Sequence, residues 1–139
     1  MKLNNETLRE AVRLWFNDKA KCIEIFGHIS EWNVSEVTNM SRLFVDTYNF
    51  NEPIGNWDVS NVTNMNCMFY NSNFFNQPIG NWDVSNVTNM SNMFLMAKSF
   101  NQPIGDWDVS SVTNMEGMFK SYVDNKSELN IIHMLLEHH

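Results

Sequence analysis

The sequence predicts an α/β fold, namely a right-handed solenoid of four 25-residue repeats, each a short strand followed by a helix, with an N-terminal helical cap. Three observations predict it. Tryptophan recurs every 25 residues, at Trp32, Trp57, Trp82 and Trp107. The apolar spacing inside each unit changes from a period of two to steps of mostly three. The first 27 residues lack the repeat and carry a helical pattern instead.

Length and composition limit the class of protein. The chain has 139 residues, which suits one domain with one core. With 43% hydrophobic and 18% charged residues it fits a folded rather than a disordered chain. Its net charge of −7 argues against nucleic acid or an anionic membrane as a partner, because both require a basic surface. The polar start predicts no export signal, so we expect an intracellular or virion-associated protein rather than a secreted one.

Residues 1–27 form the predicted helical cap. An apolar stripe runs through Leu8, Val12, Trp15 and Phe16, at spacings that fit one face of a helix. Asp18 fits the start of a second helix and Gly27 its end. We expect these helices to cover the first coil of the repeats, since a solenoid must hide its terminal apolar face.

Residues 28–125 form the predicted solenoid. In one unit, Trp82 and Val84 alternate with polar neighbours, which predicts a short strand. A helix is predicted after it from apolar residues that fall on one stripe: Val87, Met90, Met93, Phe94 and Ala97. Ser85 and Thr88 both fit the N-cap position of that helix.

The segment FNQPIG, with its proline and glycine, predicts the corner that leads to the next strand. His28 occupies a column that is proline in the later corners, so we interpret it as a turn residue rather than a catalytic base. Equivalent apolar residues are expected to stack as core columns of tryptophan, of methionine (Met40, Met65, Met90, Met115) and of phenylalanine (Phe44, Phe69, Phe94, Phe119).

The C-terminal end is predicted as a separate element. Asn125 stands where the repeat requires phenylalanine, and residues 126–135 carry an amphipathic pattern. This segment either folds back as a cap or exchanges with a second copy of the chain, so monomer and homodimer both remain open. Residues 136–139 resemble the remnant of a purification tag.

At the motif FNQPIGNWDVSNVTNMSNMF, residues 75–94, the chain resembles the BspA-like repeat family, which is leucine-rich-repeat-like with units of about 25 residues. Members occur in mycoplasma-type surface proteins, protists and large DNA viruses. The resemblance extends from Ile29 to about Phe119, and the N-terminal segment ETLREAVRLWF also looks like the leader that precedes such repeats. It implies a surface or interaction protein without an established catalytic activity.

Negative charge is concentrated in the repeats. Between Ser30 and Phe119 there are nine acidic residues and two basic ones, which accounts for the whole net charge. The outward positions of the predicted strands form a polar, acidic face that we expect to bind a partner: Glu31, Asn33, Asn56, Asp58, Asn81, Asp83, Asp106 and Asp108. The competing interpretation is that these are solvated positions, and that the column Asn39, Asn64, Asn89 and Asn114 satisfies backbone groups at the turns.

Metal sites and catalysis are poorly supported by the sequence. Carboxylate and amide oxygens suit calcium, but no EF-hand spacing is present, and we expect no cofactor. Serine and aspartate recur in each unit without a recurring histidine, as a hydrolase triad would require. Asp106 and Asp108 could imitate a glycosidase pair, but nothing distinguishes them from repeat surface. Cys22 and Cys67 are predicted to be free thiols.

Together these observations predict a noncatalytic protein–protein interaction module that presents an acidic, asparagine-rich strand face to a basic or hydrogen-bonding protein partner. The alternative is a self-associating structural component of a virion or surface layer. The two differ in solution, because a building block associates further as its concentration rises while a binding module stays a defined small species.

Overall fold

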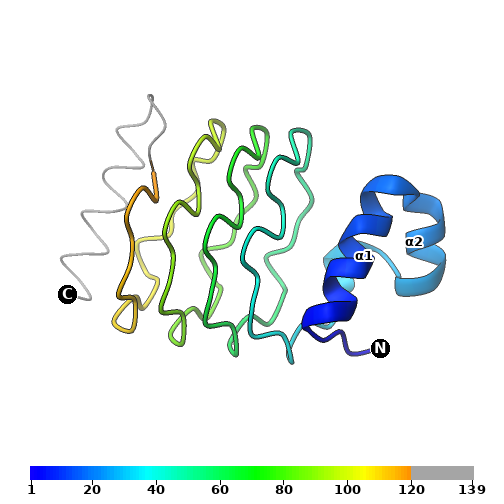
Figure 1. The fold of residues 1–139 in the computed structure, drawn as a ribbon, viewed down its shortest axis with the longest axis horizontal. Coiled ribbons are helices and arrows are strands. Elements are labelled where there is room, and N and C mark those ends of the chain that lie inside the picture. Colours follow the sequence, from blue (N-terminus) through cyan, green and yellow to red (C-terminus); the bar gives the residue numbers. More distant parts are fainter. Residues whose placement is uncertain (120–139) are drawn as a thin grey trace.

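The computed structural model describes residues 1–119. Two α-helices, α1 (Asn5–Asn17) and α2 (Lys19–Phe26), lie at the N-terminal end, followed by a short 3-10 helix, η1 (Ile29–Glu31). After these the chain winds into open loops that lie side by side along one axis (Figure 1). We call these loops coil 1 (residues 32–56), coil 2 (57–81), coil 3 (82–106) and coil 4 (from 107). No helix of the described part is long and apolar enough to cross a bilayer.

Both α-helices form where the apolar pattern predicts helix. Asn4 caps α1: its side chain accepts the backbone N–H groups of Glu6 and Thr7, and Thr7 returns a bond to the backbone N–H of Asn4. Asp18 caps α2 and Gly27, at φ 80°, ends it. The predicted stripe is buried at three positions, but Phe16 is 46% exposed and lies off the buried face.

The prediction of an α/β, leucine-rich-repeat-like solenoid of strand–helix repeats is wrong. In the described part of the coils there is no α-helix and no strand, only isolated parallel bridges that join Asn39, Asn64, Asn89 and Asn114 in turn. A further bridge joins Lys2 to Asn33. The segment around Trp82 and Val84 forms no bridge, and no helix begins after Ser85 or Thr88.

Consecutive tight turns explain why the apolar residues of each unit are spaced as they would be in a helix. The N–H of Met93 bonds the carbonyl of Met90, and that of Ala97 bonds the carbonyl of Phe94, so each bond spans three residues. Between these turns, every second backbone N–H group points out of its own coil and bonds the next one. Those of Met90 and Phe94 bond carbonyls of coil 4, at 2.9 and 3.0 Å. An α-helix would use every N–H within its own segment, so bonding to the next coil excludes it.

Two columns of these turns require a left-handed backbone. The first column has positive φ at Arg42, Cys67, Asn92 and Gly117, and the second at Asp46, Asn71 and Met96. Only the last member of the first column is glycine. Arg42, Cys67 and Met96 each cost about 1–2 kcal/mol in this conformation, whereas asparagine and aspartate adopt it more readily. The hydrogen bonds between coils stabilise this strained backbone conformation, because each turn directs its N–H groups toward the next coil.

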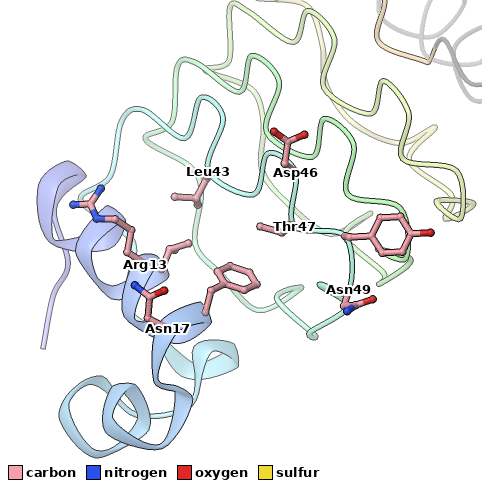
Figure 2. Close-up of a pocket in the computed structure, with 9 residues that line it drawn as sticks. Arg13, Asn17, Leu43, Asp46, Thr47 and Asn49 are labelled. Atoms are coloured by element: carbon pink, nitrogen blue, oxygen red, sulfur yellow. The ribbon is translucent and has the colours of Figure 1, made fainter.

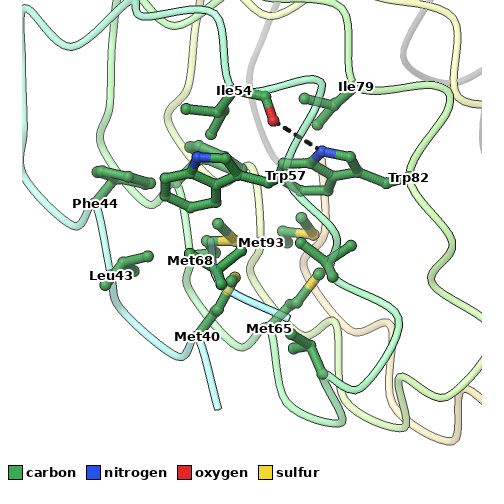
Figure 3. Packing of buried hydrophobic residues seen from close by; sticks show 14 of the residues in the cluster. Met40, Leu43, Phe44, Ile54, Trp57, Met65, Met68, Ile79, Trp82 and Met93 are labelled. Atoms are coloured by element: carbon green, nitrogen blue, oxygen red, sulfur yellow. Dashed lines mark hydrogen bonds between the residues drawn. The ribbon is translucent and has the colours of Figure 1, made fainter. Parts of the chain in front are cut away.

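Stacked aromatic rings form the core that the tryptophan repeat predicts. Trp32 stacks on Trp57 with centroids 6.3 Å apart, and Trp82 stacks on Trp107 at 6.4 Å. All four indoles are at most 5% exposed. The Nε1 of Trp82, at the start of coil 3, donates to the carbonyl of Ile54, near the end of coil 1, at 3.1 Å (Figure 3). A phenylalanine column stacks beside them: Phe44 on Phe69 at 5.7 Å, and Phe69 on Phe94 at 5.5 Å. Burial is confirmed for the whole tryptophan column and for Phe44, Phe69 and Phe94, whereas Phe119 is only partly buried.

Glycine permits close approach of the corners. A Cβ atom on Gly80 would lie 2.6 Å from the carbonyl oxygen of Pro103, and one on Gly55 would lie 2.5 Å from that of Pro78. Neighbouring corners therefore touch through backbone atoms, and any side chain at these positions would push the coils apart.

The predictions made for the C-terminal end fall outside the described residues. These are the break of the repeat at Asn125, the capping or exchanging segment 126–135 and the tag remnant 136–139. The boundaries proposed for the domains stay predictions.

Candidate interaction surface

The eight residues of the predicted face are all exposed, but they do not lie on strands. They occupy turns and extended loops that recur at the same place in successive coils. Because bridges at Asn39, Asn64, Asn89 and Asn114 hold the coils in register, the residues align as two columns. The acidic column is Asn33, Asp58, Asp83 and Asp108, and the outer column is Glu31, Asn56, Asn81 and Asp106.

Each member of the acidic column stabilises its own turn. Asp58 Oδ1 accepts the hydroxyl of Ser60 at 2.6 Å and its backbone N–H at 3.0 Å. Asp83 does the same with Ser85. These bonds close Asx turns, which position the aspartate backbone at the surface. The Ser60 hydroxyl, and then its backbone N–H, hold the pKa of Asp58 below its usual value against a smaller opposing effect of burial.

Asn33 shows that this turn does not need a charge. Its Oδ1 accepts the N–H of Ser35 at 3.1 Å and the hydroxyl at 2.7 Å, as the aspartates do in later coils. An amide oxygen therefore suffices for the structural task. The negative charge of Asp58 and Asp83 is additional to what the fold requires.

The asparagines of the bridges have a structural role. Asn39 Oδ1 accepts the N–H of Ser41 at 2.8 Å, and Asn64 Oδ1 accepts that of Asn66 at 2.9 Å. The same contact recurs for Asn89 and Asn114. The interpretation of this column as one that satisfies backbone groups is confirmed.

Few basic groups neutralise the face. The salt bridges of the described residues join Lys2 to Glu36 at 3.9 Å, and Glu52 to both Lys19 at 3.8 Å and His28 at 3.9 Å. None of them reaches Asp58 or Asp83. Asp58 and Asp83 are therefore exposed to solvent without a salt bridge among the described residues.

The remaining reactive residues have local structural roles. His28 Nδ1 accepts the N–H of Ser30 at 3.2 Å at the start of η1, and its ring packs edge-on against Trp15, as a turn residue would. Cys22 and Cys67 are buried free thiols, as predicted, and burial raises the pKa of the Cys22 thiol. Within residues 1–119, no three His, Cys, Asp or Glu side chains gather as a metal site would require.

Sequence reasoning missed a groove between α1 and coil 1, which we call the α1 groove. It has a volume of about 500 Å³ and lies between α1 and coil 1 (Figure 2), where it is lined by Val12, Arg13, Phe16, Asn17, Leu43, Asp46, Thr47, Tyr48 and Asn49. Beyond Phe16 it continues into a hollow of about 280 Å³ beside Lys19 and Glu52. No local pattern in the sequence indicates this groove, because Phe16 was predicted to lie on the same apolar face as Trp15.

Exposed aromatic residues lie at one end of this groove. Tyr48, which lines it, is 56% exposed and packs edge-on against Phe74 of coil 2, which is 49% exposed, with centroids 5.1 Å apart. Neither belongs to the stacked columns of the core. Large exposed aromatic side chains of this kind are frequent in protein interfaces.

Comparison with known proteins gives a family but no characterised relative. No curated protein matches the chain, and no solved structure matches it. A family model matches residues 12–131, which is most of the 139-residue chain. The protein therefore belongs to the family described as "Mycoplasma protein of unknown function, DUF285".

Proposed function

We propose that this protein is a noncatalytic interaction module that binds a basic protein partner through its acidic column. The observation that carries the proposal is the surplus charge at Asp58 and Asp83. Asn33 makes the same turn without a charge, so the fold alone does not require carboxylates at positions 58 and 83. Like charges at neighbouring positions in register repel each other, and a basic partner would relieve that repulsion.

The scaffold suits this role because it is rigid at the places that carry the charge. The carboxylates are fixed by bonds to Ser60 and Ser85, and the coils are fixed to each other by backbone bonds. A partner would therefore meet charges already held in place, which lowers the ordering cost of binding. Repeat proteins commonly use extended surfaces in this way.

The resemblance of the repeat motif to BspA-like repeats supports the same proposal. Members of that family are described as surface or interaction proteins, and we extend that role to this chain as part of the proposal. Only the role is extended, because the strand–helix repeat expected from that family is absent from the described coils.

The test uses a variant that removes charge and keeps the turns. In the double variant Asp58→Asn and Asp83→Asn, each amide oxygen can replace the carboxylate, as Asn33 does in coil 1. Immobilised wild-type chain and double variant are compared for the proteins that they retain from an extract of the native source. Glu24→Gln, on the exposed surface of α2, is the matched control.

The proposal expects proteins that the wild type and Glu24→Gln retain but the double variant loses, with retention that falls as salt rises. Equal retention by all three chains would refute it. Light scattering at two concentrations tests the alternative of a self-associating component, because growth of the particle with concentration that survives the double substitution would favour that function instead.

A further inference from the structure

The first coil presents an edge of carbonyl oxygens that has no coil before it. In coil 2 the carbonyls of Asn66, Met68 and Tyr70 accept N–H groups from coil 1 at 2.8–2.9 Å. The residues 25 positions earlier are Ser41, Leu43 and Val45. Because the coils repeat in register, we infer that their carbonyls point away from coil 2, to the side on which α1 lies. Within residues 1–119, no N–H group bonds these three oxygens.

Helix α1 covers only the beginning of this edge. The side chain of Asn5 accepts the N–H groups of Thr38 and Asn39 at 2.9 and 3.2 Å. Arg9 Nη2 then donates to the carbonyl of Asn39 at 3.4 Å. Farther along, α1 and coil 1 separate to form the α1 groove. The uncovered part of the edge therefore meets the groove at Leu43, which is the edge residue that lines it.

The walls of the α1 groove are apolar near its floor and charged at its rim. Val12, Phe16 and Leu43 supply the apolar surface. Phe16 is half-exposed although it faces coil 1, where its ring lies 6.0 Å from that of Phe50. Arg13 stands on the α1 side of the rim and Asp46 on the coil side. A volume of about 500 Å³ is within the range that holds ligands in proteins.

We propose that the α1 groove binds an extended peptide segment of a partner protein by adding it to the carbonyl edge of coil 1. Alternate N–H groups of the peptide donate to the carbonyls of Ser41, Leu43 and Val45, which is recognition by strand addition. The peptide runs parallel to coil 1, because every bridge of the described stack is parallel. One large apolar side chain fills the space beside Phe16.

The charges of the groove specify the peptide further. Asp46 lies at the rim directly after the edge, and the chain as a whole carries a charge of −7. A basic residue after the apolar one would therefore lie next to Asp46 and be favoured by the field of the protein. This site is separate from the acidic column, so the inference does not depend on the function proposed above.

The test selects peptides without assuming their sequence. A library of random nonapeptides displayed on phage is selected on the immobilised wild-type chain. The enriched peptides are then compared on Asn17→Trp, in which an indole would occupy the groove from the end of α1, and on Glu24→Trp, which places the same side chain on exposed α2. Thermal unfolding of both variants checks that they fold.

The expected result is a set of peptides that share a large apolar residue followed by a basic one, and that bind wild type and Glu24→Trp but not Asn17→Trp. Synthetic copies with N-methyl groups on one alternate set of amides should lose at least about tenfold in affinity, while methylation of the other set should have little effect. The double variant Asp58→Asn and Asp83→Asn should bind as wild type does.

Three results would overturn the inference. One is that no peptide is enriched on wild type over Asn17→Trp. Another is that N-methylation of either set of amides weakens binding equally, which would place the contact in side chains alone. The third is that wild type dimerises in light scattering and Asn17→Trp does not, because a second copy of the chain would then occupy the groove.

Discussion

The side chain of Asn5 bonds Thr38 at the position where a coil before coil 1 would do so. Its Oδ1 accepts the backbone N–H of Thr38 at 2.9 Å, whereas in the next coil the equivalent N–H, of Thr63, bonds the carbonyl of Thr38 at 2.8 Å. A side-chain amide at the start of α1 therefore supplies the acceptor that a preceding coil would supply. Its Nδ2 also donates to the Thr38 hydroxyl at 3.0 Å.

Replacing Asn5 by alanine should lower the stability of the first coil. The change removes the acceptor of the N–H groups of Thr38 and Asn39, which should cost about 0.5–1.5 kcal/mol in the free energy of unfolding, because both residues are exposed and water can replace the acceptor. Urea denaturation measures the loss, and amide hydrogen exchange should show faster exchange at these two residues. Asn5→Asp keeps an acceptor oxygen and should stay closer to wild type. Equal loss in both variants would show that the acceptor is not what matters.

The core column predicts a large effect at Trp82. This indole is 4% exposed and donates to the carbonyl of Ile54 in coil 1. Trp82→Ala should lower the free energy of unfolding by about 3–5 kcal/mol, because it removes buried surface and leaves a cavity. Trp82→Phe, which keeps a ring but loses the donor, should cost less. A melting temperature near that of wild type for the alanine variant would place the indole outside the core.

The left-handed turns predict that glycine should stabilise one exposed position. Arg42 is exposed and has φ 58°. In Arg42→Gly, relief of about 1–2 kcal/mol of backbone strain should outweigh the entropy cost of glycine, about 0.5–1 kcal/mol. Lys98→Gly is the matched control, since Lys98 is exposed and its φ is not positive. The control should lose stability in urea denaturation. A loss of similar size in Arg42→Gly would argue against the strained turn.

The turn at Asp58 predicts that the pKa of this carboxyl depends on the Ser60 hydroxyl. The Ser60 hydroxyl is the main cause of the lowered pKa of Asp58, so Ser60→Ala should raise that pKa toward its ordinary value. Side-chain carboxyl chemical shifts followed by NMR against pH measure it. Ser85→Ala removes the equivalent bond at Asp83 and should leave the pKa of Asp58 unchanged.

The same shift gives the sign of the pH dependence of stability. A carboxyl whose pKa is lower in the folded than in the unfolded protein contributes stability above its unfolded pKa, and that contribution is lost as the pH falls through the folded pKa. The wild type should therefore lose stability below about pH 4, the ordinary range of an aspartate. Ser60→Ala should show a smaller loss over that range. An equal loss in both chains would contradict the role of the hydroxyl.

The tryptophan period of 25 was enough to predict which residues stack, because identical residues at a constant spacing must meet the same environment in every coil. It was not enough to predict the backbone. Met90, Met93 and Ala97 have a spacing that fits both a helix and a run of three-residue turns. Only the direction of the N–H groups distinguishes the two, and bonds between coils are not visible in a local pattern.

The candidate sites were likewise predictable from the sequence only in part. The exposure of Asp58 and Asp83 followed from their alternation with buried tryptophan and valine, although the strands assumed for them are absent. Their bonds to the serine two residues later could have been predicted, since aspartate closes such turns by itself. The α1 groove could not be predicted from the sequence. It depends on the angle between α1 and the edge of coil 1, and that angle is set by packing between segments distant in sequence.

The ladder between coils also gives the stack an electrical direction. Between coil 1 and coil 2, four backbone N–H groups point forward and two point back, so the bond dipoles cancel only in part and a net dipole remains along the axis. The oxygen-rich, electronegative pole lies at the N-terminal end, where Arg9 and Arg13 are placed, and the electropositive pole lies at the other end. Adding whole units would lengthen the stack without reversing it, so chains of any repeat number would offer opposite polarity at their two ends.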